Sequence, residues 1–397
     1  MPYPDALARV LSRLRTLEVV EVDIDDAVGL VTATEVTAPE AVPPFDNTAV
    51  DGFAVRASEI QDVPTELRVV ATVAAGVPPE VSLGPRECAR IMTGAVIPGD
   101  ADSVVMVEDT EMVGPDTVRV LAAGETGRHV RRRGDDLGAG DVALAAGTVL
   151  RPAHVGLLAT VGRPTVTVFR RPVVGVVSTG DELVGPEVPL QPGQIRDSNR
   201  QMLLALCRAA GFVAVDLGLV PDDEARIEAA LRSAADTCDA VVTSGGVSMG
   251  DFDYVKAVLG RIGEMEWMQV AIKPAKPLAF GTIGGTPVFG LPGNPVSSLV
   301  SFELFARPGL NTMAGYPDPH PRRLQAMVPD GLDRRSDGKT HFVRVLLDST
   351  DEGLVAHTSG GQGSHQLAAS AGADGLAVLG DGPGVGPGSR VDVIPLR

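Results

Sequence analysis

The sequence has 397 residues and a formal net charge of −17 at pH 7, with 21% charged and 44% hydrophobic residues. A chain of this length and composition is globular and holds about two to four domains. Its acidity argues against nucleic-acid binding, which needs a basic face, and no apolar run approaches the ~18 residues that cross a membrane.

The three cysteines, Cys88, Cys207 and Cys238, are isolated from one another and form no CxxC pair. We expect them to be buried free thiols in a reducing compartment rather than metal ligands or disulfides. The first residues, MPYPDALARVL, carry an early acid and lack the small-residue cleavage site of a secretory leader. The sequence therefore predicts a cytoplasmic protein.

The amino-terminal part begins with a helix opened by Pro4 and Asp5 and continues into short strands. One face of this helix carries apolar residues at helical spacing: Leu7, Val10, Leu11 and Leu14. Residues 18–45 alternate apolar and polar, and residues 65–120 hold several short strands with turn signals. This pattern predicts a small β-rich insert, followed after Pro152 by a helix.

From Arg171 onward, predicted strands alternate with predicted helices, a pattern typical of a mostly parallel sheet covered by helices on both faces. Ser198–Gln201 resembles a capping box at the start of one helix, and Asp222 is expected to cap the next. From about Asp318 to Arg397 the sequence returns to short strands and glycine turns, which predicts a small all-β domain.

The stretch from Asp239 to Asp253, together with its flanks, is the one around which the chain is organised. Ala240–Val242 is a buried strand, Ser244, Gly245 and Gly246 form a turn, and a helix follows with Val255, Val258, Leu259 and Ile262 on one face. Open α/β sheets bind ligands at such a turn. Its backbone N–H groups suit an anion, and Asp251 and Asp253 suit a cation beside it.

Residues 291–302, LPGNPVSSLVSF, predict a helix that begins at a potential oxyanion site. Asn294 stands where an N-cap belongs and Pro295 where proline favours the first turn. Ser297 and Ser298 add hydroxyl groups near the free N–H groups of that turn. An ordinary cap without a ligand explains the motif equally well.

Two lysines stand three residues apart in VAIKPAKPLAFG, each followed within the motif by a proline. Lys273 and Lys276 in a loop stiffened by Pro274 and Pro277 suit a phosphate or another oxyanion. The alternative is a solvated surface pair. In so acidic a chain the functional interpretation is favoured.

Several carboxylates follow predicted strands or turns: Asp51, Asp181, Glu182, Asp222, Asp251 and Asp253. Carboxylates at loop ends suit Mg²⁺, which takes one or two of them together with substrate phosphate. Taken singly, each has a structural explanation, since Asp51 can bond its own turn and Asp222 can cap a helix. Arg131, Arg132 and Arg133 are explained as a solvated run paired with Asp135 and Asp136.

Other catalytic motifs are absent from the sequence. It contains no Walker A loop, no GxSxG elbow, no CxxC pair and no histidine spacing such as HExxH. These absences argue against a P-loop ATPase, an α/β-hydrolase and a zinc ribbon.

Eight segments together resemble the MoeA family of molybdopterin molybdenumtransferases, which includes the E domain of gephyrin. In chain order they are PPFDNTAVDGFAVR, IMTGAVIPGDADSVVMVED, RRRGDD, STGDEL, GQIRDSN, TSGGVSMGDFDY, IKPAKPLAFG and LPGNPVSS. The resemblance spans nearly the whole chain in the family's order. TSGGVSMGD alone is less specific, because the molybdopterin adenylyltransferase fold shares it.

The resemblance implies a multidomain α/β plus β chain that forms a homodimer, with the active cleft between the α/β domain of one subunit and the β-rich insert of the other. The implied domains are a molybdopterin-binding α/β domain with a mostly parallel sheet (1–24 and 171–317), a small linking domain (25–45 and 141–170), a β-rich insert (46–140) and a β-barrel-like domain (318–397).

The resemblance also implies an activity: insertion of molybdate into adenylylated molybdopterin, Mg²⁺-dependent, with release of molybdenum cofactor and AMP. Carried over residue by residue, the catalytic positions are Asp51, Thr93, Asp136, Glu182, Asp222, Asp253, Pro292 and Pro295. The implied substrate-binding positions are Ser244, Gly245, Gly246, Ser248, Lys273, Lys276, Asn294, Ser297, Arg344 and Ser364. Glu182, Asp222 and Asp253 are the expected Mg²⁺ ligands.

One position departs from the family pattern. Some members carry a lysine four residues before Lys273, where this chain has Gln269. The cleft therefore has one positive charge fewer, which bears on pterin affinity and not on the class of reaction.

Two other functions compete with the transferase interpretation. A molybdopterin adenylyltransferase would need neither the β-rich insert, nor the LPGNP helix start, nor the last domain. A non-catalytic pterin-binding scaffold or carrier would not need the acids and lysines that match the family motifs. Expected protein partners of a transferase are a molybdopterin adenylyltransferase and acceptor molybdoenzymes.

Overall fold

The computed structural model describes residues 1–245 and 254–396. The chain divides into two compact units. Unit 1 comprises Met1–Val20, Gly29–Ala33 and Val168–Arg397, and unit 2 comprises Glu21–Val28 and Thr34–Thr167. Among the described residues, no helix is both long and apolar enough to span a membrane.

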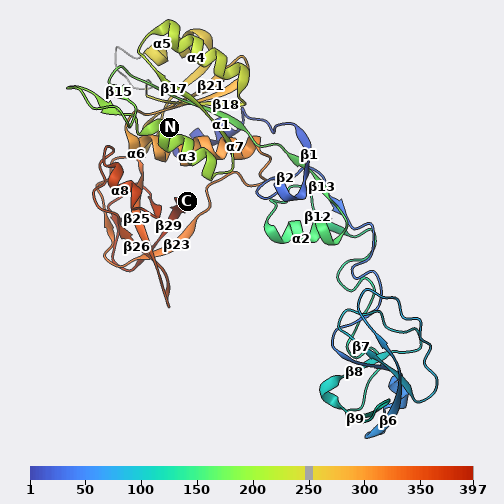
Figure 1. Ribbon diagram of the computed structural model, residues 1–397. Helices are drawn as coiled ribbons and strands as arrows, with labels where there is room; N and C mark the ends of the chain where they lie inside the picture. The colour runs from blue at the N-terminus through green and yellow to red at the C-terminus, as the bar shows by residue number, and fades with distance from the viewer. Residues whose placement is uncertain (246–253, 397) are drawn as a thin grey trace. The chain divides into compact units, whose positions relative to one another are not determined.

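The largest part of unit 1 is a six-stranded mixed sheet, of which Figure 1 labels β17, β18 and β21. Its strand order is β17-β14-β18-β22-β21-β19. The strands are β17 (Val213–Val220), β14 (Val173–Thr179), β18 (Ala240–Ser244), β22 (Thr286–Leu291), β21 (Pro277–Ile283) and β19 (Glu264–Gln269). The first four run parallel, β21 pairs antiparallel with β22, and β19 at the edge pairs antiparallel with β21. The predicted mostly parallel sheet is confirmed, with an antiparallel edge.

Helices pack on both faces of this sheet. On one face lie α1 (Tyr3–Leu11), α3 (Asn199–Ala209) and a continuous helical stretch of α6 (Pro295–Ser301), a π-helical turn (Phe302–Ala306) and α7 (Arg307–Met313). On the other lie α4 (Glu224–Thr237) and α5 (Tyr254–Ile262). Neighbouring residues of β18 point to opposite faces, since Val242 joins the first core and Val241 the second.

One predicted helix cap lacks its side-chain bond, and another is displaced by one residue. Ser198 is the N-cap of α3, as predicted, but its side chain makes no capping bond; the Asp197 carboxylate instead accepts the backbone N–H of Arg200 at 3.1 Å. At α4 the cap is Asp223, not Asp222, and it accepts the N–H of Arg226 at 2.9 Å. In both helices the group that satisfies an open N–H of the first turn is a carboxylate whose oxygen reaches it.

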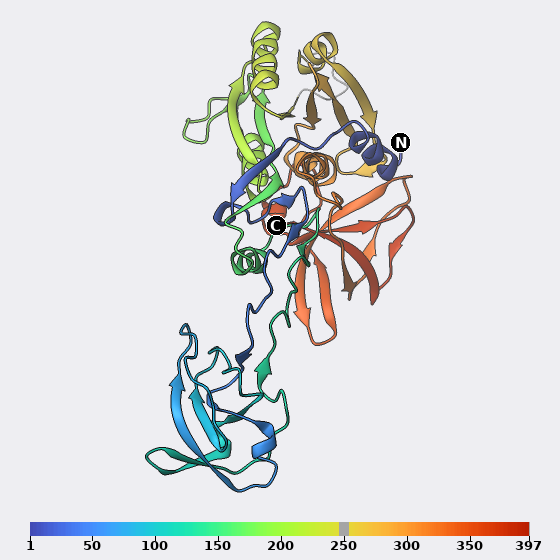
Figure 2. The ribbon, with the colours of Figure 1, turned by 90° about the vertical axis from the view of Figure 1, so that its right-hand side faces the viewer.

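The last part of unit 1 is a closed five-stranded barrel, as expected for the carboxyl-terminal domain (Figure 2). Its ring is β25 (Thr340–Thr350), β26 (Gly353–Thr358), β23 (Leu324–Val328), β29 (Ser389–Pro395) and β27 (Gly375–Leu379), and β27 pairs back with β25. Short elements around it are β20 (Ile272–Lys273), β24 (Leu332–Asp333), β28 (Gly384–Val385) and α8 (Leu367–Ala371). Small and β-branched side chains such as Val345, Ala377 and Val393 form its core.

Unit 2 is β-rich, in agreement with the predicted insert. Its main sheet has the order β8-β5-β7-β6-β10-β9. The strands are β8 (Ser103–Met106), β5 (Gly52–Val55), β7 (Glu87–Ile91), β6 (Thr65–Val73), β10 (Thr117–Val120) and β9 (Thr110–Gly114). The smaller elements are β3 (Val36–Thr37), β4 (Asn47–Thr48), β11 (Val130–Arg131), β12 (Val142–Leu144) and α2 (Pro152–Thr160).

A three-stranded sheet of β1 (Val19–Asp23), β13 (Thr165–Phe169) and β2 (Val31–Thr32) carries the chain from one unit to the other. A two-stranded ribbon of β15 (Leu183–Val184) and β16 (Ile195–Arg196) extends from the α/β part of unit 1.

The cysteines are buried free thiols, as predicted. Burial raises the pKa of Cys88 and of Cys207 to about 12, so both are protonated and unreactive at neutral pH.

Candidate functional site

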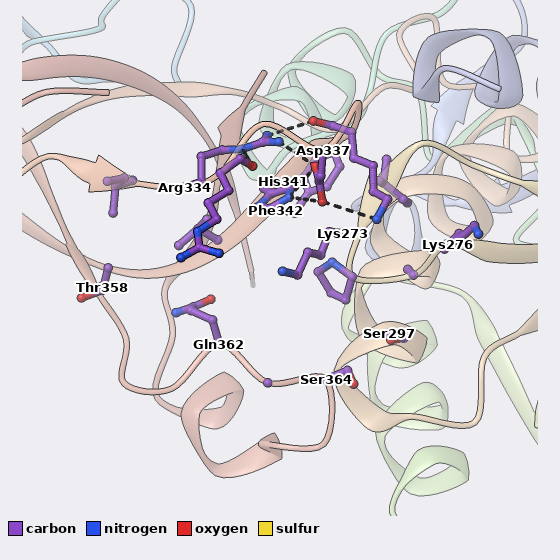
Figure 3. Close-up of a pocket in the computed structure, with 18 of the residues that line it drawn as sticks. Lys273, Lys276, Ser297, Arg334, Asp337, His341, Phe342, Thr358, Gln362 and Ser364 are labelled. Atoms are coloured by element: carbon purple, nitrogen blue, oxygen red, sulfur yellow. Dashed lines mark hydrogen bonds and ion pairs between the residues drawn. The ribbon is translucent and has the colours of Figure 1, made fainter. Parts of the chain in front are cut away.

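A cavity of about 950 Å³ opens in unit 1 between the lysine loop, the start of α6 and the barrel (Figure 3). It brings together four of the predicted substrate-binding residues, Lys273, Lys276, Ser297 and Ser364. Residues that the sequence analysis did not select also line it: Arg334, Arg335, Asp337, Lys339, His341, Thr358 and Gln362.

The lysine loop is held at both ends while its lysine side chains stay exposed. β20 pairs in parallel with β25, which places Lys273 beside His341, and the N–H of Val270 donates to the carbonyl of Lys276 at 2.8 Å. Ala275 between the lysines is buried and has a φ of 73°, in the left-handed region that alanine rarely adopts. The surroundings therefore impose the loop's conformation. In Figure 3, Lys273 lies between the Asp337–His341 pair and Ser364.

The start of α6 supplies the opposite wall. Pro295 occupies the first helical position, as predicted, but the Asn294 side chain makes no capping hydrogen bond. Instead the backbone N–H of Val296 donates to the carbonyl of Ser364 at 3.1 Å. This bond joins the 359–366 loop to the helix, so the Ser297 and Ser364 side chains line the same cavity.

Arg344 lies behind the cavity wall rather than in it. Its side chain is 1% exposed and lines no part of the cavity. The guanidinium donates to three carbonyls of the 359–366 loop, those of Gly361 (2.5 Å), Gly363 (3.3 Å) and Gln366 (3.1 Å), and to Ser370 Oγ (3.0 Å). Burial lowers the pKa of the guanidinium, but it remains charged. In this structure Arg344 orders the loop that presents Ser364.

Gln362 reinforces the same loop. Its Oε1 accepts the backbone N–H of Arg344 at 3.0 Å, and its Nε2 donates to the carbonyl of Arg344 at 3.1 Å. The side chain thus pairs with the β25 backbone as another strand would. Only the pairing of distant segments reveals this role, and no sequence signal indicated it.

Asp337 is the centre of a charged cluster on the barrel side of the cavity. Its carboxylate contacts the Arg334 guanidinium at 2.8 Å and the Lys339 ammonium at 3.4 Å. His341 Nε2 lies 3.2 Å from each of the two carboxylate oxygens. Reduced solvation by itself raises the pKa of Asp337, but hydrogen bonds from His341 and Lys339 outweigh it and hold the pKa below its usual value. Burial lowers the pKa of His341 and outweighs the Asp337 bond, so the imidazole is neutral at pH 7.

A second group of predicted residues meets at the carboxyl end of β18. Ser244 ends this strand, and the N–H of Gly245 donates to the carbonyl of Leu291 at 3.1 Å. Asn199 links the two turns, because its Nδ2 donates to Ser244 Oγ (2.8 Å) and to the carbonyl of Gly293 (2.7 Å). Ser244 and Gly245 therefore lie beside the turn that contains Pro292 and Asn294.

Asn199 was missed as a site residue, although it ends the GQIRDSN segment quoted above. It is 9% exposed, and its Oδ1 has no hydrogen-bond partner in the described part of the chain. A buried amide oxygen of this kind is a potential acceptor for a ligand that approaches the Ser244–Gly245 turn.

Two of the three predicted Mg²⁺ ligands lie on adjacent loops. Glu182 follows β14 and Asp222 follows β17, and these strands are neighbours in the sheet. The loops touch, since the N–H of Asp222 donates to Asp181 Oδ1 at 3.1 Å and that of Gly180 to the carbonyl of Val220 at 3.3 Å. Among residues 1–245 and 254–396 no three His, Cys, Asp or Glu side chains gather to hold a metal.

The third expected Mg²⁺ ligand, Asp253, lies outside the described residues, as do Gly246 and Ser248. Asp253 follows β18, which pairs with β14. The three predicted acids therefore follow three adjacent parallel strands, β17, β14 and β18. Of these three, Glu182 and Asp222 lie within the described residues, and both could hold a metal ion there.

Unit 2 brings Asp51 and Thr93 together. Asp51 Oδ1 accepts both the backbone N–H and the hydroxyl of Thr93, each at 2.7 Å. These bonds, the backbone bond first, lower the pKa of the exposed Asp51 carboxyl. The Asp51 side chain therefore bonds to Thr93, which follows the end of β7, rather than within its own turn.

Asp136, the third predicted residue of unit 2, has an exposed carboxylate and a backbone N–H that donates to the carbonyl of Val42 at 3.0 Å. The expected pairing of the arginine run with the following acids is wrong for Arg132. Its guanidinium instead pairs with Asp46 at 2.6 Å, and Asp135 accepts the Arg132 backbone N–H.

Three family models match the chain in order. They are the MoeA N-terminal region (domain I and II) over residues 1–162, a probable molybdopterin binding domain over 175–312, and the MoeA C-terminal region (domain IV) over 331–396.

Relatives and solved structures agree with these matches. Molybdopterin molybdenumtransferase 2 of Mycobacterium tuberculosis is 40% identical over 377 residues, 92% of each chain. The molybdopterin molybdenumtransferase of Haemophilus influenzae is 38% identical over 349 residues, covering 87% of this chain and 86% of the relative. The crystal structure of a molybdopterin biosynthesis MoeA protein from Pyrococcus horikoshii superimposes with a TM-score of 0.81 at 32% identity, covering 100% of this chain and 99% of that one. The chain therefore belongs to the MoeA family.

Proposed function

We propose that this chain is a molybdopterin molybdenumtransferase, which takes molybdate and adenylylated molybdopterin and releases molybdenum cofactor and AMP. The observation that carries the proposal is the cavity at the lysine loop. In a chain of net charge −17, it gathers Lys273, Lys276, Ser297 and Ser364, all of them oxyanion donors, on walls fixed by backbone hydrogen bonds.

In this proposal the lysine-loop cavity holds molybdate. The ammonium of Lys273 offsets the charge of the dianion, and the Ser297 and Ser364 hydroxyls donate to its oxygens. Arg344 keeps the 359–366 loop in place through its carbonyls. Because backbone hydrogen bonds hold the segments that carry these donors before the anion binds, the backbone needs little reorganisation on binding.

The Ser244–Gly245 turn and the adjacent Pro292–Asn294 turn would bind the adenylylated pterin. The proposal places the pyrophosphate of this substrate near the carboxyl ends of β14, β17 and β18, where Glu182, Asp222 and Asp253 follow the strands. A Mg²⁺ ion held by these acids would neutralise phosphate charge and favour P–O cleavage. The exposed Glu182 and the half-buried Asp222, on touching loops, fit such an ion.

Asp51, Thr93 and Asp136 of unit 2 complete the proposed set of catalytic residues. We also propose that the chain is a homodimer in the cytoplasm, a compartment in which the buried free thiols remain reduced. A molybdopterin adenylyltransferase would supply its substrate, and acceptor molybdoenzymes would receive its product.

The test is AMP release from adenylylated molybdopterin by the purified chain, with Mg²⁺ and with or without molybdate. We expect molybdate to stimulate release, and Asp222→Asn to reduce it at least tenfold. Asp236→Asn is the matched control, because Asp236 is an exposed acid on α4 away from these loops. Pterin binding without AMP release would contradict the proposal and favour a carrier.

A further inference from the structure

The lysine-loop cavity is lined by five basic and two acidic side chains, in a protein whose net charge is −17. The basic residues are Lys273, Lys276, Arg334, Arg335 and Lys339, and the acidic ones are Asp333 and Asp337. A concave, low-dielectric wall concentrates the field of such charges. An approaching anion is thus repelled by the net charge of the protein and attracted near this opening.

The basic side chains from the barrel side of the cavity differ in their partners. Arg334 pairs with Asp337 at 2.8 Å and with Asp381 at 3.0 Å. Lys339 pairs with Asp337 at 3.4 Å. Arg335, in contrast, has an exposed side chain that forms no ion pair with any residue in the described ranges. Of the three basic residues in segment 334–339, Arg335 is thus the one that has no ion-pair partner in the described ranges.

The segment that presents Arg335 is anchored on both sides. The Arg334 guanidinium donates to the carbonyls of Lys339 (2.9 Å) and Gly380 (2.8 Å), and its Nε donates to the carbonyl of Arg335 itself (3.3 Å). Ser336 Oγ donates to Asp381 at 3.0 Å. The backbone at Arg335 is therefore fixed beside the cavity while its side chain remains free to reach into solvent.

We propose that Arg335 is an electrostatic capture residue: it draws a tetrahedral dianion toward the cavity, and the Lys273–Ser297–Ser364 wall then binds it. This inference rests on the proposed function, because it presumes that the cavity takes such an anion. Arg335 acts at long range and does not contact the bound anion. Its contribution depends on charge and is screened by salt.

The test is isothermal titration of molybdate into the full chain at ionic strengths from about 10 mM to about 500 mM, for wild type and Arg335→Gln. A unit charge that acts on a dianion through water changes affinity by about fivefold at low salt, and screening removes most of this effect at high salt. Arg335→Lys should bind as wild type does, because it keeps the charge. Arg390→Gln is the control for net charge, since Arg390 is an exposed barrel arginine outside the cavity.

The inference is supported if Arg335→Gln loses about fivefold in affinity at low salt and matches wild type at high salt, while Arg390→Gln changes neither. Equal binding by Arg335→Gln and wild type at low salt would overturn it. So would a loss that persists undiminished at high salt, which indicates direct contact. A wild-type chain that binds no molybdate in any salt would instead overturn the proposed function of the cavity.

Discussion

Removing the Arg344 guanidinium should loosen the loop that presents Ser364. In Arg344→Met, three loop carbonyls and Ser370 Oγ lose their donor at a site where the arginine is 1% exposed. A hydrogen bond from a charged donor contributes about 1.5–3 kcal/mol. Because the loop itself is partly exposed and water replaces some of these bonds, we expect a local loss of about 3 kcal/mol rather than the full sum.

The assay is amide hydrogen exchange of residues 359–371. A local loss of about 3 kcal/mol predicts exchange roughly 150-fold faster in this segment, and Arg390→Met should leave it unchanged. Molybdate affinity should fall along with the order of the loop. Unchanged exchange together with abolished molybdate binding would refute the reasoning, since it would make Arg344 a direct ligand of the anion.

Three further outcomes follow from single contacts. Thr93→Val removes the hydroxyl hydrogen bond to Asp51. Carboxyl NMR should then show the lowered pKa of Asp51 rising toward about 3.9. An unchanged pKa would contradict the claim that this hydrogen bond lowers it. Gly245 has a φ of 92°, so Gly245→Ala should cost about 1–2 kcal/mol in thermal unfolding, whereas Gly260→Ala in α5, with open space around it, should be neutral or stabilising. Because the pKa of His341 is lowered in the folded state, the unfolded chain binds the extra proton, and stability should fall as pH drops through about 6.5. His341→Gln should lose that dependence, and a wild-type imidazole that titrates above 6.5 by NMR would contradict it.

The sequence was most informative where a local pattern decides the structure. The apolar run Ala240–Val242 predicted β18, the helical spacing of Val255 and Val258 predicted α5, and Pro295 marked the first turn of α6. Each of these depends on periodicity or on the fixed φ of proline, which act over a few residues.

The misplaced caps show the limit of such patterns. Asp222 and Asp223 are adjacent acids of equal capping propensity, and only the backbone decides between them. Asp223 has extended dihedrals, with φ −124° and ψ 120°, and so directs its carboxylate to the first turn.

The cavity itself could be predicted only in part. Lys273, Ser297 and Ser364 came from motifs and resemblance, but the placement of Lys273 beside His341 depends on the pairing of β20 with β25, two segments far apart in the sequence. Whether Arg344 faces the cavity or the loop behind it likewise depends on the closed barrel. These are tertiary effects, and no local pattern encodes them.

The most direct test of the account combines two measurements on one reaction: AMP release, and the ability of the product to reconstitute an apo-molybdoenzyme. For wild type with Mg²⁺ and molybdate, both should appear together. Lys273→Ala should need a higher molybdate concentration for both, and Arg390→Ala should behave as wild type does. AMP release by wild type that is indifferent to molybdate and gives no reconstituting product would contradict the central claim.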